Sequence, residues 1–204
     1  MLKCKIIKKL NHFSLDVEFQ VDNEITCIMG QSGSGKTSIL NSIAGLLKPD
    51  VGEIILDENI LFSNQINLKP QQRNIGYVFQ DYALFPNMNV KENIFFMNPD
   101  ENYTNSLIEK LEIEYLLENY PNTLSGGEKQ KVSIVRALAN KPKLLLMDEP
   151  FSSIDEKFKN KFYEELIEIK KFLDIPIIMV THNRTEAEIL AHRIIFIDKG
   201  NIIK

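Results

Sequence analysis

Gly30-Gln31-Ser32-Gly33-Ser34-Gly35-Lys36-Thr37 is the stretch of sequence that decides the fold of this chain. Its glycines and its Lys-Thr ending fit a loop that wraps phosphate groups at a helix N-terminus, where a Cβ would block the approach of the backbone. We expect Lys36 to reach the β- and γ-phosphates of a nucleotide, and the Thr37 hydroxyl to bind Mg²⁺. The predicted nucleotide-binding residues of this phosphate loop are Gly30, Gln31, Ser32, Gly33, Ser34, Gly35, Lys36, Thr37 and Ser38.

The residues around the loop favour this interpretation over a flexible Gly/Ser turn. The apolar run 25–29 predicts a strand before the loop, and apolar residues with helical spacing follow it over residues 39–47. Residues 5–7 and 13–19 predict two more strands, and apolar residues alternate with polar ones in the second. We expect these three N-terminal strands to form a half-buried antiparallel sheet.

Strand-like and helix-like segments alternate along the rest of the chain, which predicts a mostly parallel sheet. Residues 81–140 differ, because aromatic, Asn and Pro residues mix there with a helical stretch near residues 107–117. The predicted fold is α/β, of the P-loop NTPase (RecA-like) type, with an N-terminal antiparallel β subdomain and an inserted small helical subdomain. The expected strands are 54–56, 75–79, 144–147, 176–181 and 194–197, and the expected helices include 132–139 and 158–173.

The length of 204 residues predicts one domain with one sizeable core. We expect residues 1–80 to hold the antiparallel subdomain and the first part of the core, residues 81–140 the helical subdomain, and residues 141–204 the second part of the core. The chain ends soon after its last predicted strand, so we expect no further domain.

Composition and charge disfavour several functions. The net charge of -4 argues against a broad nucleic-acid surface. Cys4 and Cys27 form no close metal-ligand pair and are expected to be buried thiols. The N-terminus has no export signal, and the apolar runs are far shorter than the roughly 20 residues that cross a bilayer. Any membrane contact is therefore expected through a partner.

Two acidic residues end the apolar run 144–147. Asp148 lies at the predicted carboxyl end of a strand, where it can hold Mg²⁺ through water, and Glu149 can orient or deprotonate an attacking water. Two solvated acids that merely end a strand are the alternative. The complete phosphate loop favours the functional interpretation.

Leu124-Ser125-Gly126-Gly127-Glu128 forms a second glycine-containing segment, called here the Ser-Gly-Gly segment. Ser125 and Glu128 fit a capping box at the start of a helix. The same helix start, with two glycines, also predicts a second anion-binding site. We expect both interpretations to hold, although one nucleotide per chain needs only one such site.

The chain resembles the ABC-type ATPases, the nucleotide-binding subunits of ABC transporters, over essentially its whole length. The resemblance rests on the phosphate loop, Gln80, the Ser-Gly-Gly segment, Asp148-Glu149, Ser152-Ser153-Ile154-Asp155 and His182, in this order and spacing.

This resemblance implies ATP and Mg²⁺ as cofactors and a head-to-tail dimer with a second cassette, expected to be identical. The phosphate loop of one chain and the Ser-Gly-Gly segment of the other would sandwich each ATP. It implies Glu149, His182 and Gln80 as catalytic residues and Thr37, Gln80 and Asp148 as Mg²⁺ ligands. The nucleotide-binding set then also includes Ser125, Gly126, Gly127 and Glu128, and the dimer interface includes Ser125, Gly127, Ser153 and Asp155.

Some positions depart from the pattern of the family or leave a choice open. Lys131 stands where many relatives have Arg, and it lacks the planar five-donor group that makes bidentate contacts. Asn183 follows His182 where Asp is common. The aromatic residue that stacks on adenine is expected to be Phe13, with Leu10 at the other plausible register.

Residues 69–86 resemble importers of the molybdate, sulfate, sugar and iron group. The resemblance implies an ATP-hydrolysing subunit on the cytoplasmic face of the cell membrane, driving import of an oxyanion such as molybdate or of another small solute. Transmembrane permease subunits would contact the region after Gln80, and an extracytoplasmic solute-binding protein would act with them. The alternatives are a soluble ABC ATPase that acts on DNA or ribosomes, and a phosphate-loop kinase.

Overall fold

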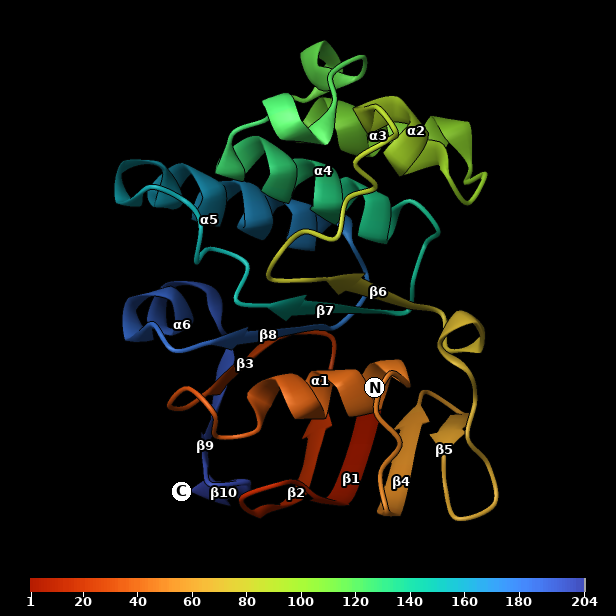
Figure 1. The fold of residues 1–204 in the computed structure, drawn as a ribbon, viewed down its shortest axis with the longest axis vertical. Coiled ribbons are helices and arrows are strands. Elements are labelled where there is room, and N and C mark those ends of the chain that lie inside the picture. Colours follow the sequence, from red (N-terminus) through yellow and green to blue (C-terminus); the bar gives the residue numbers. More distant parts are fainter. Residues whose placement is uncertain (204) are drawn as a thin grey trace.

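The computed structural model describes residues 1–203, which form a twisted sheet of ten strands with helices on both of its faces (Figure 1). The strand order is β5-β4-β1-β2-β10-β9-β3-β8-β7-β6. The strands are β1 (Leu2–Lys9), β2 (Ser14–Val21), β3 (Ile25–Met29), β4 (Val51–Leu56), β5 (Asn59–Phe62), β6 (Ile75–Val78), β7 (Leu144–Asp148), β8 (Ile177–Thr181), β9 (Arg193–Asp198) and β10 (Asn201–Ile203). The α/β class predicted from the sequence is therefore confirmed.

Parallel pairing joins β9, β3, β8, β7 and β6. Every residue of β7 and β8 is buried, as expected for continuous apolar strands that are covered on both faces. The assignment of residues 25–29 to the antiparallel sheet is wrong, because β3 pairs in parallel with β8 and β9. Its sequence Ile-Thr-Cys-Ile-Met is apolar on both faces and lacks the polar alternation of a half-exposed strand.

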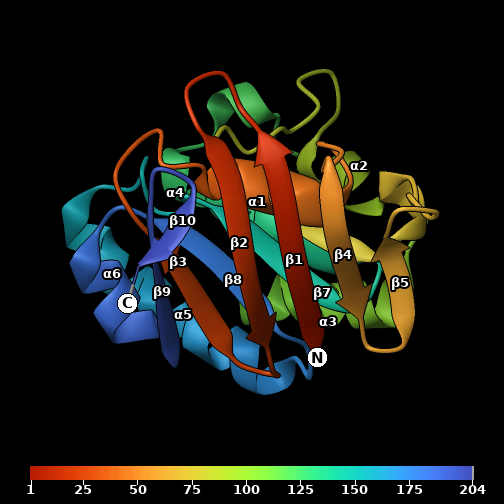
Figure 2. The same cartoon turned by 90° about the horizontal axis from the view of Figure 1, so that it is seen from below.

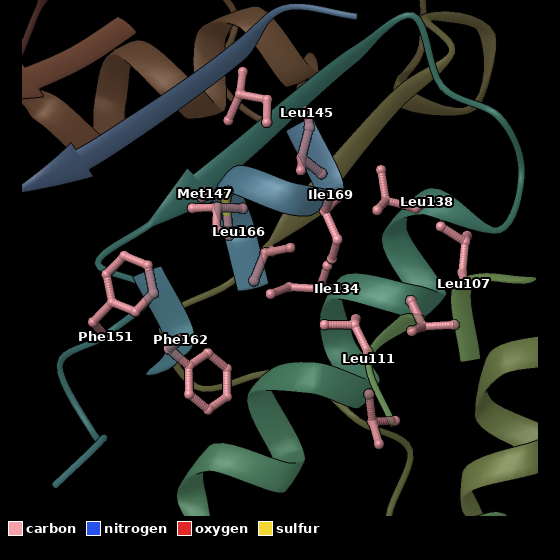
Figure 3. Packing of buried hydrophobic residues seen from close by; sticks show 14 of the residues in the cluster. Leu107, Leu111, Ile134, Leu138, Leu145, Met147, Phe151, Phe162, Leu166 and Ile169 are labelled. Carbon is pink, nitrogen blue, oxygen red and sulfur yellow. The ribbon is translucent and has the colours of Figure 1, made fainter. Parts of the chain in front are cut away.

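The residues of β7 alternate between two hydrophobic clusters. Leu145 and Met147 pack with the helical layer of α4 (Gly126–Leu138) and α5 (Glu156–Phe172), as Figure 3 shows. Leu144 and Leu146 belong to the other cluster, together with α1 (Lys36–Ala44). The helix that follows the phosphate loop and the helix that follows the Ser-Gly-Gly segment therefore cover opposite faces of the sheet.

The antiparallel part of the sheet curls beneath α1, so that this helix lies between β1 and β7 (Figures 1 and 2). β1 pairs antiparallel with both β2 and β4, and β5 adds to the edge of β4. β5 has only four residues and β10 only three, too few for an alternation pattern to predict them. Of the three strands predicted for the antiparallel sheet, those expected at residues 5–7 and 13–19 are confirmed as β1 and β2, and β4 takes the place expected for residues 25–29.

Residues 81–140 contain α2 (Val90–Phe95), α3 (Glu101–Lys110) and α4, which lie in the helical layer with α5. The helix expected near residues 107–117 ends at Lys110 and continues only as a short 3-10 turn, Glu114–Leu116. The sequence analysis missed α2 and α6 (Arg184–Leu190), both too short to establish a helical period.

Cys4 and Cys27 are free thiols and both are buried, as predicted. Burial raises the pKa of the Cys27 thiol to about 12, so it stays protonated and unreactive at neutral pH. Within residues 1–203, none of the helices has the length and apolarity that crossing a bilayer requires.

Candidate nucleotide site

The phosphate loop connects β3 to α1 and owes its shape to glycines. Gly35 precedes the helix with a φ of 105°, and Gly33 has a φ of 79°. Residues other than glycine rarely adopt positive φ angles of this kind. A Cβ on Gly30 would collide with the carbonyl oxygen of Ile197 in β9. The loop thus packs against the end of β9, and its conformation requires glycine at positions 30, 33 and 35.

Lys36 is the first residue of α1 and is buried. Its Nζ donates to the carbonyl oxygens of Gly30 and Gln31, each at 2.9 Å. Burial lowers the pKa of Lys36, and the nearby carboxylates of Glu149 and Asp148 oppose this effect. A phosphate oxygen would be a better partner for the ammonium than two neutral carbonyl groups, because hydrogen bonds between charged groups are stronger.

Thr37 and Asp148 meet at the carboxyl edge of the sheet. The Thr37 Oγ1 donates to Asp148 Oδ1 at 3.2 Å, and burial raises the pKa of the Asp148 carboxyl. A hydroxyl and a carboxylate are suitable Mg²⁺ ligands, and Mg²⁺ commonly completes its shell with phosphate oxygens and water. No cluster of three or more His, Cys, Asp or Glu side chains that could hold a metal ion occurs among residues 1–203.

Glu149 and His182 form a pair beside these residues. The His182 Nδ1 lies 3.2 Å from Glu149 Oε1, and the side chain of Glu149 is 18% exposed. Glu149 has a φ of 45°, an uncommon conformation for a residue other than glycine, and its N–H donates to the Val180 carbonyl of β8 at 3.0 Å. Such backbone strain is often found at functional sites.

A cleft of about 690 Å³, called here the nucleotide cleft, brings the phosphate loop together with Gln80, Glu149 and Phe13. Leu10 lines it as well, so both candidate registers for the adenine contact face the cleft. An added Cβ on Gly35 would lie 3.3 Å from the Phe13 ring, which places that ring against the phosphate loop. Asp148 and His182 do not line the cleft themselves and reach it through Thr37 and Glu149.

The sequence analysis missed part of the wall of this cleft. The missed lining residues are Lys8, Lys9, Asn11, His12 and Leu47. Lys8 and Lys9 end β1, and Asn11 and His12 belong to the turn between β1 and β2, which carries no motif. The lysines and the histidine were a signal in the sequence, because basic side chains near a phosphate loop suit an anionic ligand.

The Ser-Gly-Gly segment begins α4, and the predicted capping box is present. The Glu128 N–H donates to Ser125 Oγ at 3.3 Å, and Glu128 Oε2 accepts from the Ser125 N–H at 2.8 Å. The hydrogen bond from the Ser125 hydroxyl lowers the pKa of the Glu128 carboxyl. A Cβ on Gly126 would collide with the Ser153 carbonyl, so the glycine permits close contact with the segment before α5.

A second cleft of about 430 Å³ lies over this helix start. It is lined by Ser125, Gly126, Gly127 and Glu128 together with Ser153 and Asp155, and it contains no phosphate-loop residue. The structure therefore brings the predicted interface residues together, at a place separate from the nucleotide cleft.

The two positions that depart from the family pattern make contacts within the chain. The Lys131 Nζ donates to the Leu111 carbonyl at 3.0 Å and to Glu165 Oε1 at 2.7 Å. The Asn183 Oδ1 caps α6 by accepting from the Thr185 N–H at 2.9 Å. Lys131 therefore joins α4 to α5 in the wall of the second cleft, and Asn183 fixes the start of α6.

Comparison with known protein families gives one match over most of the chain. The sequence profile of the ABC transporter family matches residues 10–152. The molybdenum import ATP-binding protein ModC of Mannheimia succiniciproducens is 43% identical over 209 residues, with 99% of this chain and 59% of that protein covered. ModC of Haemophilus influenzae is 42% identical over 205 residues, with 98% and 58% covered. The chain thus spans less than two thirds of the length of these curated relatives.

Solved structures show the same fold. The dimeric ATP-binding cassette MJ0796, bound to ADP and Pi, matches with a TM-score of 0.83 at 29% identity, over 100% of this chain and 97% of that chain. CbiO1 of Clostridium perfringens, part of the ABC transporter complex cbiONQ, matches with a TM-score of 0.84 at 25% identity, over 100% and 86%.

Proposed function

The chain belongs to the ABC transporter family, and on this premise we propose that it is the ATP-binding and ATP-hydrolysing subunit of a molybdate importer. The observation that carries the proposal is the nucleotide cleft, where the phosphate loop, Gln80 and Glu149 converge. Relatives named for molybdenum import support the choice of solute.

The phosphate loop holds the triphosphate. Its backbone N–H groups at the start of α1 face the phosphates, and the Lys36 ammonium exchanges two carbonyl partners for phosphate oxygens. The Thr37 hydroxyl, Asp148 and Gln80 hold Mg²⁺, which supplies charge neutralisation at the phosphates when bound. Phe13 or Leu10 contacts the adenine from the turn before β2.

Glu149 orients the water that attacks the γ-phosphate and accepts a proton from it. His182 holds the carboxylate through the contact between Nδ1 and Oε1, and it donates a hydrogen bond to the γ-phosphate. Gln80 contacts the same water. Hydrolysis then needs no covalent enzyme intermediate, since positioning and electrostatic stabilisation supply most of the catalysis in this reaction class.

The second cleft belongs to a dimer. Ser125 and Gly127 bind the γ-phosphate of ATP held by a second, identical cassette, and Ser153 and Asp155 lie at the interface. The dimeric solved cassette supports this arrangement. Permease subunits contact the region after Gln80 and hold the chain at the cytoplasmic face of the membrane, and a solute-binding protein delivers molybdate to them. Nucleic acid has no part in this function.

The alternative functions receive no support from these relatives. A soluble ABC ATPase for DNA or ribosomes does not agree with relatives named for import, and a phosphate-loop kinase does not agree with the family match.

A reconstituted transporter tests the proposal. The chain, its permease and its binding protein in proteoliposomes should hydrolyse ATP only with Mg²⁺, and molybdate should stimulate this activity more than sulfate does. A purified chain that transfers phosphate to a small molecule, or that hydrolyses no ATP, would refute the ATPase assignment. Stimulation by another solute would refute only the assignment of molybdate.

A further inference from the structure

Glu186 is a buried carboxylate that neither cleft uses. It lies in α6 and is 4% exposed. Its Oε2 accepts a hydrogen bond of 2.6 Å from Thr181 Oγ1, and its Oε1 accepts from Lys159 Nζ at 3.3 Å. A buried charge is costly unless it is paired, so a carboxylate held at this depth calls for an explanation.

Two residues that form hydrogen bonds with Glu186, Thr181 and Asn183, lie directly before and after His182 in the sequence. Thr181 is the last residue of β8, and its Oγ1 also accepts from the Asn183 N–H at 3.0 Å. Asn183 in turn caps α6 through its Oδ1, which accepts from the Glu186 N–H at 3.4 Å. The residues on both sides of His182 are therefore bound to α6 and to the Glu186 carboxylate.

Lys159 extends this network to α5. It pairs with Glu186 in α6 and with Glu156 at 3.0 Å in the first turn of α5, and its side chain is 12% exposed. Asp155, at the edge of the second cleft, immediately precedes that turn. The network thus runs from the turn that carries His182 to the helix that begins at the second cleft.

We propose that Glu186 is a positioning residue for ATP hydrolysis, which acts through Thr181 to hold His182 against Glu149. The inference rests on the proposed function. The carboxylate has two oxygens, one for the Thr181 hydroxyl and one for Lys159, whereas a glutamine has only one oxygen that can accept. Glu186→Gln therefore keeps the volume of the side chain and breaks one of the two contacts.

Steady-state kinetics of the parent chain and of Glu186→Gln test the proposal. We expect kcat to fall about tenfold, because a small displacement of a positioned group can be that costly. KM for ATP and binding of ATP to the monomer should change less than about twofold, since Glu186 lines neither cleft. The matched control is Glu188→Gln, which removes an exposed carboxylate of the same helix that pairs with Arg184 at 2.6 Å.

A double-mutant cycle with His182→Ala separates positioning from general support of the fold. If Glu186 acts through His182, Glu186→Gln causes no further loss of kcat in the His182→Ala background. An equal loss in both backgrounds, or a loss that the Glu188→Gln control reproduces, overturns the proposal. A parent chain that does not hydrolyse ATP refutes the proposed function instead.

Thr181 gives a second route if Glu186→Gln does not fold. Thr181→Ser keeps the hydroxyl and should retain the parental kcat, whereas Thr181→Val keeps the shape and should lower kcat as Glu186→Gln does. The imidazole resonances of His182 should shift in the valine variant but not in the serine variant. Parental kcat and an unshifted His182 signal in Thr181→Val would contradict the positioning role.

Discussion

Glu149, the residue proposed to act on the attacking water, has a strained backbone conformation. Its φ of 45° turns the chain sharply after β7, so its carboxylate faces the nucleotide cleft while Asp148 stays buried. This conformation supports the proposed division of roles, in which Asp148 holds Mg²⁺ and Glu149 orients the attacking water. The sequence alone predicted the pair but not the turn that separates them.

Glu149→Gln should keep ATP binding and lose hydrolysis. The amide cannot accept the proton from water, and we expect a loss of about 10²–10⁴-fold in kcat. ATP-bound dimers should then accumulate, which size-exclusion chromatography with Mg²⁺ and ATP can measure. A variant that hydrolyses ATP normally and stays monomeric would contradict both the role of Glu149 and the dimer.

Asp148→Asn should stabilise the nucleotide-free chain. Burial raises the pKa of Asp148 above its unfolded value, so the folded chain binds more protons and loses stability as pH rises from the unfolded pKa through the folded pKa. The amide removes this cost, and we expect Tm at pH 7 to rise by about 2–4 °C. Differential scanning calorimetry should show the gap between variant and parent closing at acidic pH.

The same variant should lose its response to Mg²⁺. Added Mg²⁺ and ATP should raise the Tm of the parent more than that of Asp148→Asn, because ligand that binds only the folded chain stabilises it by mass action. An equal rise in both proteins would show that Asp148 is not needed to hold the metal.

At the scale of elements, Arg73 ties α1 to the connection before β6. It is buried, its Nη1 donates to the Ser42 and Ile43 carbonyls at 2.8 Å, and its Nε donates to the Leu68 carbonyl at 2.9 Å. The Ser42 and Ile43 carbonyls lie in the last turn of α1, where helical N–H partners run out, and the Ser42 carbonyl also accepts from the Gly45 N–H at 3.2 Å. Arg73 and Gly45 thus cap the helix that follows the phosphate loop together.

Arg73→Met should lower the free energy of unfolding by about 3 kcal/mol, because several buried carbonyl groups lose their donor. Urea denaturation monitored by circular dichroism measures this loss. Arg184→Met is the control, since Arg184 lies on the surface in an i,i+4 pair that should contribute little. A similar effect of both changes would mean that Arg73 does not cap α1.

The elements that sequence reasoning predicted best are those whose local pattern agrees with their surroundings. The fully apolar run of β7 and the glycine-rich loop before α1 each have one simple physical explanation. β10 and α6 were missed because their few residues are specified by neighbours, such as the pairing with β9 and the Asn183 cap. Lys8, Lys9, Asn11 and His12 were missed because only the folded chain brings the end of β1 and the turn after it to the phosphate loop.

At the scale of the whole molecule, two clefts with different residues lie in one chain. The nucleotide cleft and the second cleft share no lining residue, and α1 and α4 cover opposite faces of the sheet. A head-to-tail pair of chains would complete two equivalent sites, each made from the phosphate loop of one chain and the Ser-Gly-Gly segment of the other.

Mixed dimers can test this composition directly. Lys36→Ala alone and Ser125→Arg alone should each abolish hydrolysis, and Ser125→Arg should leave ATP binding by Lys36 and Thr37 largely intact. An equal mixture should recover about a quarter of the parental activity, because half of its dimers would be mixed and each would hold one intact site of two. A mixture that stays inactive, while chromatography shows dimers, would mean that each chain hydrolyses ATP alone.

The alternating side chains of β7 and β8 also limit which substitutions this sequence can accept during evolution. Leu145, Met147, Ile177 and Met179 belong to the cluster of the helical layer, whereas Leu144, Leu146, Ile178 and Val180 belong to the cluster around α1. A substitution that changes side-chain volume in one cluster can be compensated by a neighbour in the same cluster, without any change in the other cluster. The two clusters should therefore diverge at separate rates. β7 and β8 should change slowest, because each strand must pack into both clusters.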